Sequence, residues 1–196
     1  GQSGILLAGA DLATIGYFQS RQRELKRYRA SLTQLRGTAA VTADRQAVTL
    51  YANIELPADI AAAKKNGAAG VGLYRTEFLF MDRDTEPDEE EQTHAYTRIV
   101  KAFKDAPVII RTLDVGSDKP VHSGAVTDSA NPALGLRGVR YSLRDPQHFK
   151  TQLRAILRAS AHGAARIMFP MLTGMQELVQ VAQLLEEAKT ELAARK

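Results

Sequence analysis

Three features that this sequence lacks narrow the range of its functions. It contains no cysteine, which excludes disulfides, thiolate metal sites and a cysteine nucleophile. No apolar run approaches the roughly 18 residues that a membrane span requires. The first residues also lack a charged segment followed by an apolar core, the pattern of a secretory signal. We therefore expect a cytoplasmic protein with no membrane partner.

A large excess of positive charge is also lacking. Lys and Arg total 26 and Asp and Glu total 22, which gives a net charge of +4 in 196 residues. Basic residues cluster only along a predicted helix at 12–35, where a solvated outer face is the simplest interpretation and a basic binding surface is the alternative. No Gly-x-Gly-x-x-Gly motif follows a first strand, which argues against a dinucleotide site. We expect no nucleic-acid partner.

Short apolar segments alternate with helical patterns along the chain. A short strand and turn are expected within 4–16, followed by the helix at 12–35. Apolar and β-branched residues predict four further strands, at 48–54, 71–75, 107–114 and 165–171. Amphipathic patterns and capping residues predict the helices between and after them, at 58–66, 88–104, 146–161 and 175–196. The acidic run at 89–91 is interpreted as a helix start.

The order of these elements predicts an α/β fold. The predicted strands are short and apolar without clear alternation, which is typical of a parallel sheet buried on both faces, with helices outside it. Two architectures remain open, a doubly wound sheet and a (β/α)8 barrel. Four β/α units in about 150 residues correspond to half of a barrel of about 250 residues.

Charged and polar side chains gather where the predicted strands end. Ligands bind at the C-terminal ends of the strands in both architectures. The candidates at these ends are Asn53, Arg75, Glu77, Arg111 and Asp114, and those on the loop and short element after the third of these strands are Lys119, Arg137 and Arg140.

Arginine is the residue type that gives this set its chemistry. Its planar guanidinium matches carboxylate and phosphate oxygens in pairs, so several arginines from different strands indicate a small, multiply charged anion. A single arginine here is most simply a structural ion pair, whereas Arg75 and Arg111 end two separate strands. Glu77 and Asp114 are candidates to orient the guanidiniums or to assist a metal bound mainly elsewhere. The four histidines have no spacing that suggests a metal site.

Five segments resemble one family. They are GAAGVGLYRTEFLFM at 67–81, IRTLDVGSDK at 110–119, NPALGLRGVR at 131–140, QLRAILRAS at 152–160 and RIMFPM at 166–171. In this order they resemble enzyme I of the bacterial phosphoenolpyruvate-dependent sugar phosphotransferase system. Pyruvate phosphate dikinase and phosphoenolpyruvate synthase share the barrel, but their arginine motif usually continues differently.

The resemblance implies a fold and an activity. The family's C-terminal domain is a (β/α)8 TIM barrel that binds phosphoenolpyruvate and Mg²⁺ and forms a homodimer. Residues 1–38 would then be a helical linker from an N-terminal phosphohistidine domain, and 39–196 the first half of the barrel. The family is a transferase that passes the phosphoryl group to its own histidine and then to a histidine-containing phosphocarrier protein, for sugar uptake or its regulation.

The motif matches also assign residues to the substrate. By resemblance, Arg75 and Arg111 would grip the phosphate, Arg137 or Arg140 would extend the same basic pocket, and Lys119 would be a weaker neighbour. Asn53, Glu77 and Asp114 would support them.

Departures from the family pattern limit what this chain would do alone. None of its histidines has the Gly-Gly-x-x-Ser-His setting of the phosphoryl acceptor, and the later strands that carry the Mg²⁺ ligands, a further arginine and a cysteine do not follow. Ser117 stands where the family often has a second glycine. We expect a fragment that binds the phosphate, does not catalyse transfer alone and self-associates through open strand edges. The alternatives are a dikinase-type enzyme and a non-catalytic anion-sensing module.

Overall fold

The computed structural model describes residues 7–81, 83, 85–116, 131 and 134–195. The chain divides into two compact units, Gly1–Ala47 and Val48–Lys196. Each unit is described by itself. Among the described helices, none combines the length and the hydropathy that crossing a membrane requires.

The first unit contains one long helix, α1 (Leu12–Gln34). Its N-cap Asp11 accepts a hydrogen bond of 2.7 Å from the backbone N–H of Thr14, the usual way to satisfy a free donor at a helix start. The helix predicted at 12–35 is confirmed. The strand expected within 4–16 is wrong for the described part, because residues 7–11 form a turn and a cap and the helix begins at Leu12.

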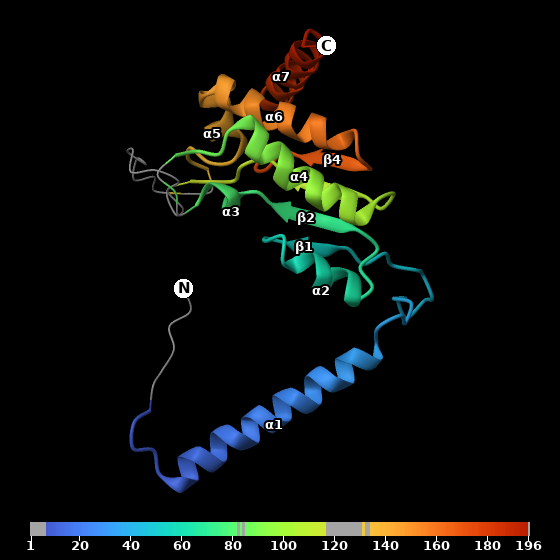
Figure 1. The fold of residues 1–196 in the computed structure, drawn as a ribbon, viewed down its shortest axis with the longest axis vertical. Coiled ribbons are helices and arrows are strands. Elements are labelled where there is room, and N and C mark those ends of the chain that lie inside the picture. Colours follow the sequence, from blue (N-terminus) through green and yellow to red (C-terminus); the bar gives the residue numbers. More distant parts are fainter. Residues whose placement is uncertain (1–6, 82, 84, 117–130, 132–133, 196) are drawn as a thin grey trace. The chain divides into compact units, whose positions relative to one another are not determined.

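The second unit is built on a parallel sheet of four strands (Figure 1). They are β1 (Ala52–Ile54), β2 (Val71–Arg75), β3 (Val108–Arg111) and β4 (Ala165–Met168). Their order in the sheet is their order in the chain, β1-β2-β3-β4, and each neighbouring pair is parallel. The predicted α/β fold with parallel strands and alternating helices is confirmed. Strand β2 has the predicted bounds, and the other three strands are shorter than the predicted segments.

Helices occupy every connection between the strands. They are α2 (Asp59–Lys65), α3 (Glu77–Phe80), α4 (Glu89–Phe103), α5 (Val139–Arg144) and α6 (Pro146–Ser160), and α7 (Met175–Ala193) follows β4. Helix α4 begins where Asp88 accepts a 2.8 Å hydrogen bond from the N–H of Glu91, so the acidic run is a helix start, as predicted. The single turn of α3 directly after β2 was not predicted, since four residues are too few to show a helical period.

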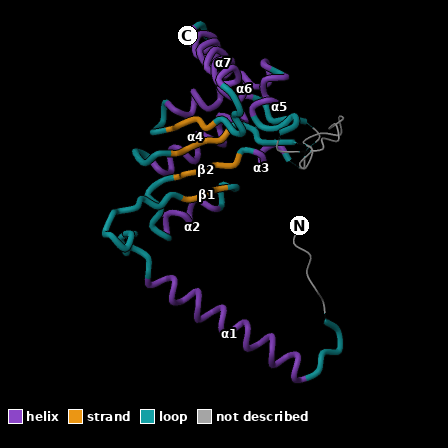
Figure 2. The backbone as a smooth tube through the Cα atoms, turned by 180° about the vertical axis from the view of Figure 1, so that it is seen from behind, coloured by secondary structure: helices purple, strands orange, loops and turns teal. Residues whose placement is uncertain are grey.

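The main core lies between one face of the sheet and the helices α4 and α6. Buried strand residues such as Val71, Val108 and Ile110 pack against apolar side chains of both helices, and Figure 1 shows α4 in front of the strands. From behind, in Figure 2, the strands lie in front of α4. Leu73 and Ile109 on that second face are only half-buried. Among the described residues, burial is therefore complete on the face that α4 and α6 cover and only partial on the other face.

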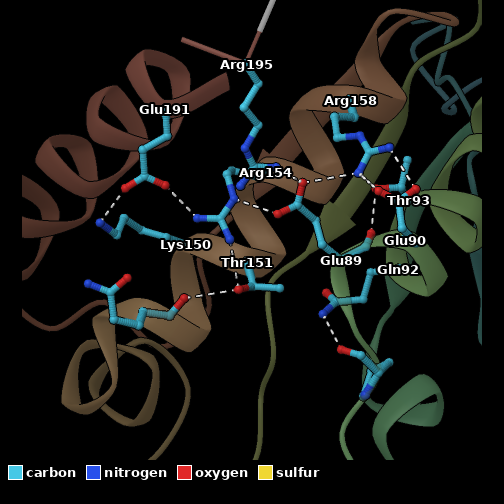
Figure 3. Close-up of polar contacts among 12 residues, drawn as sticks. Glu89, Glu90, Gln92, Thr93, Lys150, Thr151, Arg154, Arg158, Glu191 and Arg195 are labelled. Atoms are coloured by element: carbon cyan, nitrogen blue, oxygen red, sulfur yellow. Dashed lines mark hydrogen bonds and ion pairs between the residues drawn. The ribbon is translucent and has the colours of Figure 1, made fainter. Parts of the chain in front are cut away.

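Ion pairs join the outer helices to each other (Figure 3). Glu89 at the start of α4 accepts hydrogen bonds from Arg154 (2.7 Å), Arg158 (3.1 Å) and Arg195 (2.6 Å). Arg154 also donates to Glu191 of α7 at 2.6 Å. Since these residues come from α4, α6 and the end of α7, one carboxylate connects all three segments.

Candidate functional site

Two arginines stand side by side at one edge of the sheet. Arg75 is the last residue of β2 and Arg111 the last residue of β3. The register pairs them directly, and neighbouring strands lie about 4.8 Å apart. In parallel strands, paired residues point to the same side, so both guanidiniums leave the sheet from adjacent points. The two arginines that the sequence places at the ends of separate strands are therefore neighbours in the sheet.

Arg111 is held by two carboxylates. Its Nη2 lies 2.8 Å from Oε1 of Glu77, and its Nη1 lies 3.1 Å from Oδ2 of Asp114. The same Glu77 oxygen accepts the backbone N–H of Asp114 at 3.0 Å. The Glu77 side chain is only 3% exposed and that of Arg111 18%. Because these side chains have little contact with solvent, the charge-assisted hydrogen bonds fix the plane of the Arg111 guanidinium before a ligand binds.

Two buried atoms of this pair have no hydrogen-bond partner among the described residues. They are Oε2 of Glu77 and Nε of Arg111. Buried polar atoms are normally satisfied, and exceptions often mark places where a water or ligand belongs. Here a donor and an acceptor are left over at the strand end itself.

Arg75 is more accessible than Arg111. One nitrogen, Nη1, is paired with Glu55, which follows β1, and the side chain is 37% exposed. Within the described part of the chain, its other guanidinium nitrogens have no protein partner. Arg75 can therefore present donors to a ligand without losing its own ion pair.

Arg137 joins the cluster through Asp114. Its Nε lies 3.1 Å from Oδ1 of Asp114, whose other oxygen contacts Arg111. The chain reaches this position by a turn at Gly138, which has φ +56° and whose missing Cβ would lie 3.0 Å from the carbonyl oxygen of Pro170. A side chain would be strained there, so the glycine allows Arg137 to approach the strand ends.

Arg140 makes contacts with a different segment. It donates to the carbonyls of Gly135 (2.8 Å) and Met171 (3.1 Å), and it lies 3.7 Å from Oε1 of Glu177. The pKa of Glu177 is lowered, first by hydrogen bonds from Thr173 and then by Arg140. These contacts connect Arg140 to the segment after β4.

The remaining predicted site residues are less informative. Asn53 lies in β1 with an exposed side chain, and Lys119 is outside the described residues. His148, which was not among the predicted site residues, pairs with Glu86 at 2.8 Å. In the described ranges no group of three or more His, Cys, Asp or Glu residues could hold a metal ion.

The sequence interpretation overlooked some of the supporting residues. Glu177 and Thr76 were not singled out, yet Thr76 is fully buried and its hydroxyl donates to the carbonyl of Arg111 at 2.9 Å. Thr76 lies between the predicted site residues Arg75 and Glu77, and this position is the only sign of its role in the sequence. A buried hydroxyl that bridges two strands cannot be recognised until their register is known.

The fold and the site together define a class of protein. This is a parallel α/β domain in which arginines and their carboxylate partners are set at the C-terminal edge of the strands, where they suit a small oxyanion. The model of the PEP-utilising enzyme family, for its PEP-binding domain, matches residues 29–196. The chain belongs to that family.

Named relatives agree with this assignment. The chain is 45% identical over its whole length to the phosphoenolpyruvate-protein phosphotransferase of Cupriavidus necator, of which it covers 34%. It is 42% identical over 98% of its length to the protein of the same name from Staphylococcus carnosus, again covering 34%. It is also 39% identical over 97% of its length to the multiphosphoryl transfer protein of Escherichia coli O157:H7, covering 23%. The resemblance predicted from the five motifs is confirmed, and the chain spans about a third of these phosphotransferases.

Proposed function

We propose that this chain is the phosphoenolpyruvate-binding part of a phosphoenolpyruvate-protein phosphotransferase. The observation that carries the proposal is the register pairing of Arg75 with Arg111 at the C-terminal ends of β2 and β3. Two adjacent guanidiniums can bind several oxygens of one phosphate, and Arg137 extends the same edge. The names of the relatives supply the reaction: transfer of the phosphoryl group from phosphoenolpyruvate to a protein.

The chemistry assigned to these residues is electrostatic. When the phosphoryl group moves to an acceptor histidine, the bond from phosphorus to the enol oxygen breaks and the enolate of pyruvate leaves. Arginines fixed beforehand stabilise the charge on the transferring group without reorganising. Arg111, held by Glu77 and Asp114, suits that role. Arg75, with unpaired nitrogens in the described structure, would first capture the anion.

Mg²⁺ is part of the proposal as a cofactor of this family, but it receives no ligand here. The acids at the strand ends, Glu55, Glu77 and Asp114, are each paired with an arginine. The described residues contain no cluster that could hold a metal. We therefore propose that its ligands lie outside these residues, and no step is derived through it.

The proposed architecture is the first half of a (β/α)8 barrel in residues 39–196, preceded by a linker in 1–38. The strand order β1-β2-β3-β4 without reversal supports a barrel over a doubly wound sheet, in which the order turns back at a switch point. The partly exposed second face fits a barrel interior. A homodimer and a histidine-containing phosphocarrier partner belong to the same proposal.

The second candidate is a non-catalytic anion-sensing module. It is favoured by the charge balance of the site, since each arginine described at the strand ends already has a carboxylate partner. Such a module would bind many anions and would not prefer phosphoenolpyruvate. The third candidate is a dikinase-type enzyme, which a nucleotide-binding domain in the complete gene product would indicate.

Calorimetry on the complete gene product tests the proposal. Phosphoenolpyruvate is titrated in the presence of Mg²⁺ into the native protein, Arg111→Met and the control Arg98→Met, which changes an exposed arginine of α4. We expect binding that Arg111→Met weakens at least about tenfold and Arg98→Met leaves unchanged. Equal binding of sulfate, phosphate and phosphoenolpyruvate would favour the sensing module instead.

A further inference from the structure

One buried amide contacts both strand ends that carry the proposed site. Gln152 of α6 is 2% exposed. Its Oε1 accepts the backbone N–H of Leu113 at 3.0 Å. Its Nε2 donates to the hydroxyls of Thr76 (3.3 Å) and Tyr96 (3.1 Å). A single side chain from the helical layer therefore bonds to the segment after β2, to the segment after β3 and to α4.

The donors and acceptors around Gln152 allow only one orientation of its side-chain amide. Tyr96 donates its own proton to Oε1 of Gln92 at 3.1 Å, and Thr76 donates its proton to the carbonyl of Arg111. Both hydroxyl oxygens are thus left as acceptors for the Gln152 amide. A flipped amide would place its N–H₂ group against the N–H of Leu113, so the arrangement specifies the orientation of the side chain.

The two contacted segments hold the residues of the site. Thr76 lies between Arg75 and Glu77, and Leu113 directly precedes Asp114. Asp114 and Glu77 are the two carboxylates that form ion pairs with Arg111. Any movement of Gln152 would therefore change the spacing between the two strand ends and the direction of the Arg111 guanidinium.

Core filling alone does not account for this amide. A methionine of similar volume would fill the same space without the cost of desolvating an amide. Buried polar groups that are fully satisfied specify one arrangement of the elements that they join. Small displacements at a site of this kind reduce binding and rate strongly.

We propose that Gln152 is a positioning residue for the phosphate site, which sets the separation and direction of Arg75 and Arg111 through Thr76 and Leu113. This rests on the proposed function, because it assumes that the two arginines bind the phosphate of phosphoenolpyruvate. Gln152 itself does not touch the ligand.

The test compares two buried glutamines in the complete gene product. Gln152→Met removes the bonds to both strand ends. The matched control Gln92→Met removes a fully buried amide of the same network, whose other bond goes to the carbonyl of Pro87 at the start of α4. Thr76→Val, which is nearly isosteric, breaks the connection from Gln152 to Arg111. Arg111→Met reports on the phosphate site itself. Unfolding midpoints and dissociation constants for phosphoenolpyruvate are measured for each variant.

We expect Gln152→Met and Gln92→Met to lower the unfolding midpoint similarly, since each leaves buried partners unsatisfied. Affinity for phosphoenolpyruvate should fall at least about tenfold in Gln152→Met and Thr76→Val, and less than about twofold in Gln92→Met. If Gln152→Met does not fold, Thr76→Val gives the answer.

The outcomes separate the two proposals. If Arg111→Met binds phosphoenolpyruvate normally, the proposed function is wrong. If Arg111→Met weakens binding while Gln152→Met and Thr76→Val bind normally, the positioning role is overturned and the proposed function stands. Equal losses of affinity in Gln152→Met and Gln92→Met would also overturn it, because the effect would then follow stability alone.

Discussion

Arg75 and Arg111 are the same residue type at the same level of the sheet, but their surroundings differ. Arg111 is 18% exposed and held by two carboxylates, whereas Arg75 is 37% exposed and paired with one. A guanidinium fixed in advance loses little entropy when it binds, and an exposed one can follow an incoming ligand. The two residues are therefore suited to orientation and capture, respectively.

The planar fork of Arg111 is expected to matter more than its charge. Arg111→Lys keeps the charge but cannot bond to Glu77 and Asp114 together and also face a phosphate. We predict a loss of phosphoenolpyruvate affinity of at least about tenfold by calorimetry. The control Arg98→Lys should bind normally. Unchanged affinity in Arg111→Lys would show that only charge is needed.

Glu77 is the most deeply buried acid of the site, and its replacement tests how the site is held. Glu77→Gln keeps the shape but weakens the bonds to Arg111 and to the N–H of Asp114. We predict a loss of about 1–3 kcal/mol in the free energy of unfolding, measured with denaturant. Glu186→Gln, which changes a 70% exposed side chain on α7, should cost almost nothing. Equal unfolding midpoints in denaturant for Glu77→Gln and Glu186→Gln would contradict this role of Glu77.

At the scale of elements, charge fixes α7 to the rest of the helical layer. Burial tends to raise the pKa of Glu89, but bonds from Arg154, Arg195 and Arg158 outweigh it and lower the pKa below the usual 4.5. The Lys150 ammonium, with Arg154, lowers the pKa of Glu191 in the same way. Carboxylates with a lowered pKa stabilise the fold above the ordinary glutamate value, and this stability is lost as the pH falls through the folded value.

Helix α7 should therefore loosen in acid. We predict that amide hydrogen exchange in α7 speeds up, after correction for the intrinsic rate, as the pH falls below the usual glutamate value of 4.5. Glu89→Gln should show faster exchange already at pH 7, because three arginines lose their charged partner. Thr42 and Asp44, in the other unit, form an exposed pair, so Asp44→Asn should leave exchange in α7 unchanged. Exchange that is independent of pH would contradict the role of these ion pairs.

Elements were predictable where a local signal existed. The pattern of apolar residues gave every strand, and Asp88 and Pro146 marked the starts of α4 and α6. Arg75 and Arg111 could be found because each ends a strand. The partners of these arginines depend on register and tertiary contacts, and no local pattern encodes the contact from Gln152 to Leu113, 39 residues away.

For the whole molecule, the open edges of the sheet have a consequence. Among the described strands, β1 and β4 each have only one neighbour. Large apolar side chains in the adjoining segments are exposed, including Leu50, which precedes β1, at 60% and Met175, which begins α7 after β4, at 71%. Such edges favour pairing with another chain. We predict that the 196-residue chain, expressed alone, self-associates in light scattering as its concentration rises. A monomer at all concentrations would argue against uncovered edges.

The central claim is that Arg75 and Arg111 hold one phosphate together. A double-mutant cycle in the complete gene product measures this directly, with phosphoenolpyruvate affinities for the native protein, Arg75→Met, Arg111→Met and the double variant. In such a cycle, residues that share a ligand show an interaction energy of about 0.5–3 kcal/mol, whereas the effects of independent residues on the binding free energy are additive. We predict that the double variant loses clearly less affinity than the sum of the single losses. Additive losses, or no loss in either single variant, would contradict the claim.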